Sequence, residues 1–208
     1  MKGAAKDFGL DLAVIGNGRT AALVDPASRI VWWCFPRFDG DPLFSRLLAG
    51  DQEKGFTDVV LDDMVDIQSE YLRNTAIVST LLTDRHGSSV RITDFAPRFH
   101  QFGRTHRPPQ LFRIIEPVSG LPRITIRVRP THSYGQPFVH HSIGSNHIRY
   151  HNDDTVVRLT TDAPLSLIES EAPFVVTRTL HLVFGPDEPS PASSPRRASS
   201  PTAPATTG

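Results

Sequence analysis

The chain has 208 residues, of which 38% are hydrophobic, so it can bury one large core or two small ones and most of it should fold. Lysine plus arginine and aspartate plus glutamate each number 22, and this balance argues against nucleic acid or an anionic membrane as a partner. Cys34 is the single cysteine, which excludes an intrachain disulfide, and its apolar surroundings predict a buried, unreactive thiol.

The N-terminal residues 1–18 lack the uninterrupted apolar stretch of a signal peptide, because Asp7 and Asp11 interrupt it. No later segment approaches the roughly 20 consecutive apolar residues of a membrane helix. The sequence therefore predicts a reduced, cytoplasmic protein with no membrane partner.

Short runs rich in β-branched and aromatic residues recur along the chain, and turn residues close each run, as in antiparallel proteins. In chain order, the expected strands are residues 10–15, 20–24, 30–35, 75–83, 89–95, 110–118, 123–129, 137–143, 147–151, 155–160 and 174–184.

Two tight turns predict hairpins, one at residues 119–120 and one at residues 144–146. Residues 43–49, which follow Asp41-Pro42 and end at Gly50, predict one short helix. Many short strands with a single short helix favour an all-β fold, a large antiparallel β-sandwich, over repeated strand-helix-strand units.

The composition changes near Gly185, after which Pro, Ser, Ala and Thr dominate without apolar periodicity. Such a segment buries too little surface to offset its ordering entropy. We therefore expect one folded domain at residues 1–188 and a disordered tail at residues 189–208.

Residues 16–21 fit the G-x-G-x-x-A pattern of dinucleotide-binding proteins, which requires a helix whose N-terminal amides meet a pyrophosphate. Asp25-Pro26 would stop such a helix within two turns, and a strand is expected from Ile30. Although Asp39 lies near the spacing of a ribose-binding acid, we expect a glycine-containing hairpin turn and no cofactor. A nucleotide-binding enzyme is therefore a weak alternative.

Other histidines, aspartates and glutamates are of the types found in metal sites and catalytic sites, but their spacing does not fit such a site. The clustered histidines fall on an expected strand, where residues i and i+4 lie about 13 Å apart. The aspartates lack the order of a calcium loop, and the glutamates are not paired for acid–base work. We therefore expect no metal site and no catalytic residue. These residues are His140, His141, His147, His151, Asp62, Asp63, Asp66, Glu70, Glu116, Glu169 and Glu171.

The segment 32–40 ends a hydrophobic strand with Pro36, Arg37 and Asp39 among aromatic residues. A guanidinium, a carboxylate and aromatic rings suit a sugar or a rigid interface. The alternative is a strand end at which an Arg37–Asp39 pair fixes a loop. In either case both side chains should be exposed or paired with each other, because burial of unpaired charges is costly.

This segment and the one before it resemble the opening of glycoside hydrolase family 15 proteins of the bacterial trehalase-like and glucoamylase-like type. The shared patterns are Ile-Gly-Asn and Ala-Ala-Leu-Val within residues 15–24, and Trp-x-Cys-x-Pro-Arg-Phe-Asp at residues 32–39. Further matches follow in order along the chain, and the resemblance covers about residues 8–188. They lie at residues 71–75, 93–97, 127–135 and 159–165.

The resemblance implies a sandwich joined to an (α/α)6 barrel, in which two glutamates about 6.5–9.5 Å apart hydrolyse an α-glucosidic bond with inversion. No catalytic glutamate can be carried over, because the chain enters its tail where relatives continue into the barrel. We therefore expect a truncated or frame-shifted member or an excised domain. Thr131, His132 and Ser133 also depart from the family pattern, which puts a sugar or barrel contact there in doubt.

The sequence thus predicts a non-catalytic N-terminal domain that supports or completes the barrel of a trehalose- or α-glucan-hydrolysing enzyme. The expected partners are that barrel and an α-glucoside sugar. The main alternative is a free-standing carbohydrate-binding module that uses Trp32, Trp33 and Phe38, although alternation within a strand should bury at least one tryptophan. The candidate interface or active-site rim is Asn17, Arg19, Pro36, Arg37, Phe38 and Asp39.

Overall fold

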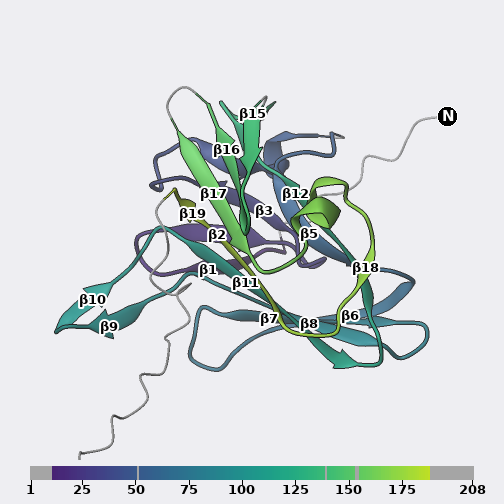
Figure 1. Cartoon of the computed structure of the whole chain (residues 1–208). Helices are drawn as coiled ribbons and strands as arrows, with labels where there is room; N and C mark the ends of the chain where they lie inside the picture. The colour runs from purple at the N-terminus through teal and green to yellow at the C-terminus, as the bar shows by residue number, and fades with distance from the viewer. Residues whose placement is uncertain (1–10, 51, 139, 153–154, 188–208) are drawn as a thin grey trace, which may run out of the picture.

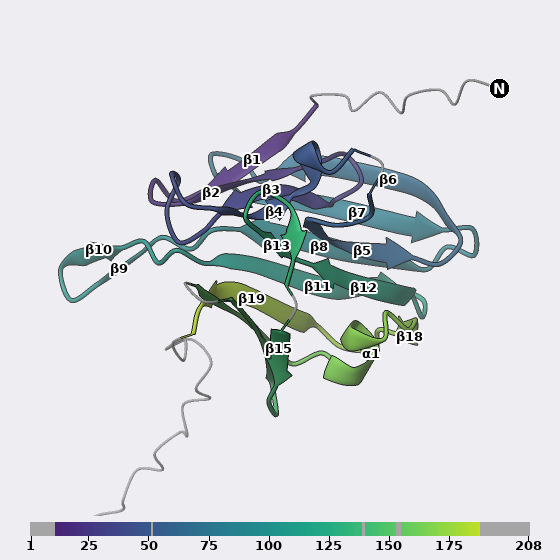
Figure 2. The ribbon, with the colours of Figure 1, turned by 90° about the horizontal axis from the view of Figure 1, so that it is seen from above.

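The computed structural model describes residues 11–50, 52–138, 140–152 and 155–187, and its strands form two layers of antiparallel sheet (Figures 1 and 2). The first sheet has the order β1-β2-β3-β5-β12-β18, with β4 also paired to β3. Its strands are β1 (Ala13–Gly16), β2 (Ala21–Val24), β3 (Ile30–Cys34), β4 (Pro42–Ser45), β5 (Phe56–Leu61), β12 (Arg123–Arg129) and β18 (Phe174–Val175).

The second sheet has the order β15-β16-β17-β19-β11-β8-β7-β6. Two small hairpins, β9–β10 and β13–β14, complete the strands, and β9–β10 projects from one end of the sandwich in both views (Figures 1 and 2). The strands are β6 (Met64–Tyr71), β7 (Val78–Asp84), β8 (Ser89–Phe95), β9 (Phe99–Gln101), β10 (Arg104–His106), β11 (Leu111–Ser119), β13 (Thr131–His132), β14 (Gln136–Pro137), β15 (His140–Ile143), β16 (His147–His151), β17 (Val156–Thr161) and β19 (Leu180–Pro186).

A hydrophobic core lies between the sheets, and in many of the strands alternate residues point into it. In β19, for example, Leu180, Leu182 and Phe184 are buried. Trp33 of β3 is fully buried, and its indole N–H donates to Thr20 Oγ1 at 2.7 Å, so its polar atom is satisfied inside the core.

A buried ion pair on the second sheet faces the first sheet. Arg113 of β11 and Asp94 of β8 have no exposed side-chain surface, and the guanidinium bonds both carboxylate oxygens at 2.7 and 2.9 Å. Its other donors reach the carbonyls of Ser28 and Thr57, which belong to the first-sheet side. The second sheet is therefore tied to the first by a network that satisfies both charges.

The all-β sandwich and most predicted strands are confirmed, but the predicted helix at residues 43–49 is wrong. Strand β4 and a 3-10 turn, Arg46–Leu48, occupy that segment. Leu43 and Phe44 are buried where β4 pairs with β3, so tertiary packing overrides the local helix signal. In the described part of the chain, the single α-helix is α1 (Leu165–Glu169).

Three other differences concern strand pairing. The hairpin predicted at residues 144–146 is confirmed, but the one predicted at 119–120 is wrong, because β11 and β12 lie in different sheets. The expected strand 174–184 is divided between the two sheets as β18 and β19. Strands β5, β6, β9, β10 and β13 were not predicted. The pairing of β5 with β12 and the assignment of β11, β12, β18 and β19 to sheets depend on residues distant in sequence, which a local pattern does not encode.

Within the described residues, no helix is long and apolar enough to cross a membrane. The predicted disordered tail at residues 189–208 lies outside the described part of the chain.

Candidate functional site

The two segments singled out from the sequence emerge at the same end of the first sheet. Gly16 of β1 pairs with Ala21 of β2, and Ala22 pairs with Trp33 near the end of β3. Antiparallel pairing therefore places the turn 17–20 beside the point where β3 runs into the loop 35–41. We call these two segments, residues 17–20 and 35–41, the end loops.

The loop 35–41 divides its residues between core and surface. Phe35 is buried and contacts Trp33 edge-to-face, with ring centroids 5.3 Å apart. The loop is closed by Phe35 N–H donating to Asp41 O at 3.1 Å. Gly40 is required there, because a Cβ atom would lie 2.7 Å from the Phe35 carbonyl oxygen. The loop is thus anchored at its base.

The remaining residues of this loop face solvent. Arg37 bonds both carboxylate oxygens of Asp39 at 2.9 and 3.0 Å, and the two side chains are 73% and 71% exposed. Pro36 is exposed, and Phe38 is 57% exposed. The expected pairing and exposure of Arg37 and Asp39 are therefore confirmed, and a preformed charge pair stands beside an exposed aromatic ring.

Asn17 has a different place from the other candidates, because it is buried. Its amide donates to the carbonyls of Pro97 and Pro108, both at 2.9 Å, and its oxygen accepts from the N–H groups of Arg19 and Thr20 at 2.9 and 3.1 Å. All of its hydrogen-bonding groups are thus used within the fold. Asn17 positions the turn that presents the exposed Arg19, and it does not itself offer a surface contact.

Within the described residues, no hydrogen bond or ion pair joins Arg19 to the Arg37–Asp39 pair. The end loops thus share one end of the sandwich without forming a closed site. A partner that uses both end loops must therefore present a surface that spans them.

A further residue at this end, Asp41, was not singled out from the sequence. Its carboxylate accepts the backbone N–H groups of Ser133 and Tyr134, the latter at 3.0 Å. Both residues have positive φ, and Tyr134 is 65% exposed. Asp41 therefore holds the β13–β14 turn against the loop 35–41. The departure of residues 130–135 from the family pattern was the only sequence signal for this contact.

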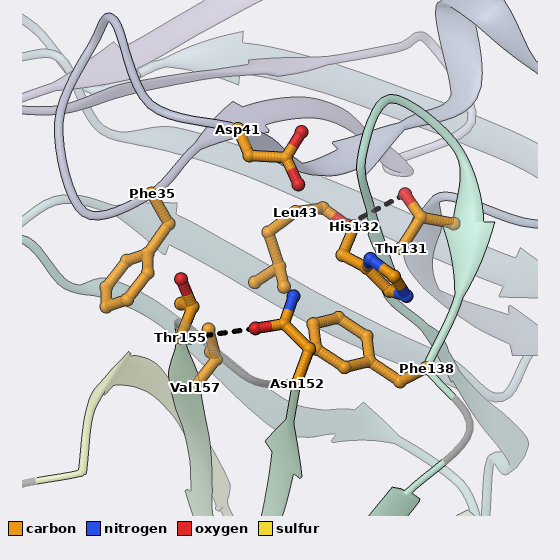
Figure 3. Close-up of a pocket in the computed structure, with 9 residues that line it drawn as sticks. All are labelled: Phe35, Asp41, Leu43, Thr131, His132, Phe138, Asn152, Thr155 and Val157. Atoms are coloured by element: carbon orange, nitrogen blue, oxygen red, sulfur yellow. Dashed lines mark hydrogen bonds between the residues drawn. The ribbon is translucent and has the colours of Figure 1, made fainter.

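Under this contact lies a small pocket (Figure 3). Thr131 Oγ1 donates to Leu43 O at 3.3 Å on one side, and Thr155 N–H donates to Asn152 Oδ1 at 2.8 Å on another. Its volume of about 20 Å³ holds about one water molecule, so a sugar does not fit there. It is lined by Phe35, Asp41, Leu43, Thr131, His132, Phe138, Asn152, Thr155 and Val157.

The nucleotide-binding alternative fails on the structure. Residues 16–21 form the β1–β2 hairpin turn, with Gly18 at a φ of 84°, and no helix follows. The pyrophosphate-binding helix that the motif requires is therefore replaced by a strand. The alternative of a carbohydrate-binding module that uses Trp32 and Trp33 also loses support, because Trp33 is fully buried.

Cys34 is half-buried rather than buried, and partial burial raises the pKa of its thiol, which keeps it protonated. The histidines are brought together as one stacked pair, His140 and His151, with ring centroids 6.0 Å apart. In the part of the chain that the structure describes, no group of three or more histidine, cysteine, aspartate or glutamate residues could hold a metal.

Comparison with known proteins gives consistent matches. The family model described as trehalase-like, N-terminal matches residues 6–178. The chain is 34% identical over 125 residues to a trehalase of Thermoplasma volcanium, a match that covers 59% of this chain and 19% of that protein. It is 38% identical over 86 residues to trehalase 1 of Sulfolobus acidocaldarius, covering 41% of this chain and 15% of that protein. These matches thus span less than a fifth of either relative, and no solved structure matches significantly.

Proposed function

Since the chain belongs to the trehalase-like N-terminal family, we propose that it serves as the non-catalytic sandwich domain of a trehalase-type hydrolase, in support of a catalytic barrel that this domain does not contain. The observation that carries the proposal is the family match over residues 6–178, together with two curated relatives that are named trehalases and are several times longer than the matched segment. Membership of glycoside hydrolase family 15, inversion at an α-glucosidic bond and a cytoplasmic location are further parts of this proposal.

The carboxylates support a scaffolding role, because the most buried ones are held by arginine. Asp94 is bound by Arg113 in the core, and Asp58 accepts from Arg127 at 2.9 and 2.5 Å and from Arg29 at 3.2 Å. A glycosidase needs one carboxylic acid that stays protonated and a second carboxylate facing a water molecule. Carboxylates whose oxygens are already bound by guanidinium groups are not free to take these roles.

The end loops suit a docking surface. The Arg37–Asp39 pair is held in one geometry before any partner arrives, which lowers the entropy lost on binding, and the exposed Phe38 offers an apolar anchor. We therefore place the barrel contact at Arg19, Pro36, Arg37, Phe38 and Asp39, with Asn17 and Asp41 positioning the loops beneath it.

The proposal is tested by a graft. The region of the Thermoplasma volcanium trehalase that corresponds to residues 1–188, which includes the 125 matched residues, is replaced by residues 1–188 of this chain. Trehalose hydrolysis is measured for this graft, for the relative with that region deleted, and for the isolated 208-residue chain. We expect activity in the graft and none in the other two. Hydrolysis by the isolated chain that is lost on mutation of one of its own carboxylates would overturn the non-catalytic role.

A further inference from the structure

A groove away from the end loops lies between α1 and the β15–β16 hairpin. Its volume is about 360 Å³, within the range of small-molecule sites. Residues of β12, including Val128 and Arg129, also line the groove, and α1 lies beside β12 (Figure 1). The groove is therefore built by elements from both sheets, so its shape is fixed by the fold.

The lining combines apolar and charged residues. Val128, Ile148 and Ile168 supply aliphatic surface, and two aromatic rings add to it. These rings are Phe138 and Tyr150, whose centroids lie 6.0 Å apart. Faces of this kind accept the C–H surfaces of a ring-shaped ligand, while the charged lining residues offer hydrogen bonds.

The Tyr150 hydroxyl has no hydrogen-bond partner among the described residues. Burial raises the pKa of this hydroxyl, and the carboxylates of Glu169 and Glu171 raise it further. The hydroxyl is therefore a protonated donor, and it is half-buried without a partner of its own among the described residues. Such a group favours a ligand that completes its hydrogen bonds.

Several of the charged residues that line the groove are paired with one another. Arg129 donates to both carboxylate oxygens of Glu171, at 2.7 and 2.6 Å, and to the Glu53 carbonyl at 2.9 Å. Glu169 lies 3.4 Å from the His141 imidazole. The three glutamates are opposed by Arg129 and Lys54, so the groove offers no excess positive charge to an anion. Its ligand should be neutral and rich in hydroxyl groups.

We infer that the groove between α1 and the β15–β16 hairpin, centred on Tyr150, Glu169 and Glu171, binds a neutral polyhydroxylated ligand the size of a mono- or disaccharide. This rests on the proposed function for the sugar class, an α-glucoside, and adds a second contact for it outside the docking surface. The carboxylates of the lining can accept from vicinal hydroxyls while Tyr150 donates to a ring or hydroxyl oxygen.

The experiment titrates trehalose, maltose and, separately, inorganic phosphate into the ¹⁵N-labelled 208-residue chain, and follows amide chemical shifts. We expect saturable shifts for at least one sugar at Ile148, Tyr150 and Ile168, with a Kd on the order of 1 mM, and none for phosphate. Tyr150→Phe removes only the hydroxyl and should weaken binding about fivefold or more. Tyr71→Phe removes a hydroxyl at the far edge strand β6 and should leave the Kd unchanged.

The inference is overturned if neither sugar gives saturable shifts, if the shifts lie elsewhere, or if Tyr150→Phe binds as well as the wild-type chain. Binding of phosphate at the groove would also overturn it, because that result would require a positive site. None of these outcomes touches the graft test, which depends on the end loops, so a failure here is distinguishable from a failure of the proposed function.

Discussion

Removal of the Asn17 side chain tests whether one buried residue fixes the geometry of the end loops. Asn17→Ala deletes two donated and two accepted hydrogen bonds, and at about 1 kcal/mol net for each bond the full loss is about 4 kcal/mol. Water can reach part of the turn through the exposed Arg19, which lowers the expected loss to about 2–4 kcal/mol.

The assay is urea unfolding of the full chain, with the free energy of unfolding extrapolated at an unchanged m-value. Asn17→Asp keeps the acceptor but loses both donated bonds and turns a carboxylate toward two carbonyls, so it should be destabilised at least as much. Arg19→Ala, next to it but exposed, should change stability by about 0.5 kcal/mol or less. A loss below about 1 kcal/mol for Asn17→Ala would refute the positioning role, because the bonds would then be replaced by water.

Three further perturbations follow from the structure. Asp94→Ala leaves its arginine buried without a counter-charge and should cost about 3–5 kcal/mol in urea unfolding; a loss below 1 kcal/mol would contradict the buried pair. Glu171 has a φ of 49° just after α1, so Glu171→Gly should be more stable than Glu171→Ala by about 1 kcal/mol in thermal unfolding, and the reverse order would exclude backbone strain there. Burial alone would raise the pKa of Asp162, but hydrogen bonds from His181 and Arg178 outweigh it and lower that pKa. Its contribution to stability is therefore complete above the unfolded-state pKa of about 3.9 and is lost as the pH falls through the folded-state value, so Asp162→Asn should flatten stability against pH below about pH 4; an unchanged acid limb would contradict this.

The local elements could be predicted from the sequence, because alternation and turn residues are local signals. Strand β8 shows this, since it spans the predicted residues 89–95 and its exposed Arg91 lies between the buried Val90 and Ile92. Assignment of strands to sheets could not be predicted in the same way. Gly120 permits a tight turn, yet the strands on either side of it join different sheets, because their partners lie far away in the chain.

The same limit applies to the candidate site. Exposure and pairing of Arg37 with Asp39 could be predicted, because both residues follow a strand end and lie two positions apart. The role of Asn17 could not, since the carbonyls that it binds are 80 and 91 residues away. The groove at Tyr150 was also missed, because its walls come from segments that only the folded chain brings together.

The most direct test of the docking claim is the trehalose kcat/KM of the graft when it carries Arg37→Ala and Asp39→Ala together. The matched control carries Asp63→Ala and Arg85→Ala, an exposed ion pair in the turns at the opposite end of the sandwich. We expect the end-loop variant to lose about tenfold or more in kcat/KM, while its unfolding free energy falls by about 1 kcal/mol or less and the control keeps full activity. Equal kcat/KM for both variants would contradict the account. So would an end-loop variant that loses stability but whose folded fraction keeps the kcat/KM of the unmodified graft.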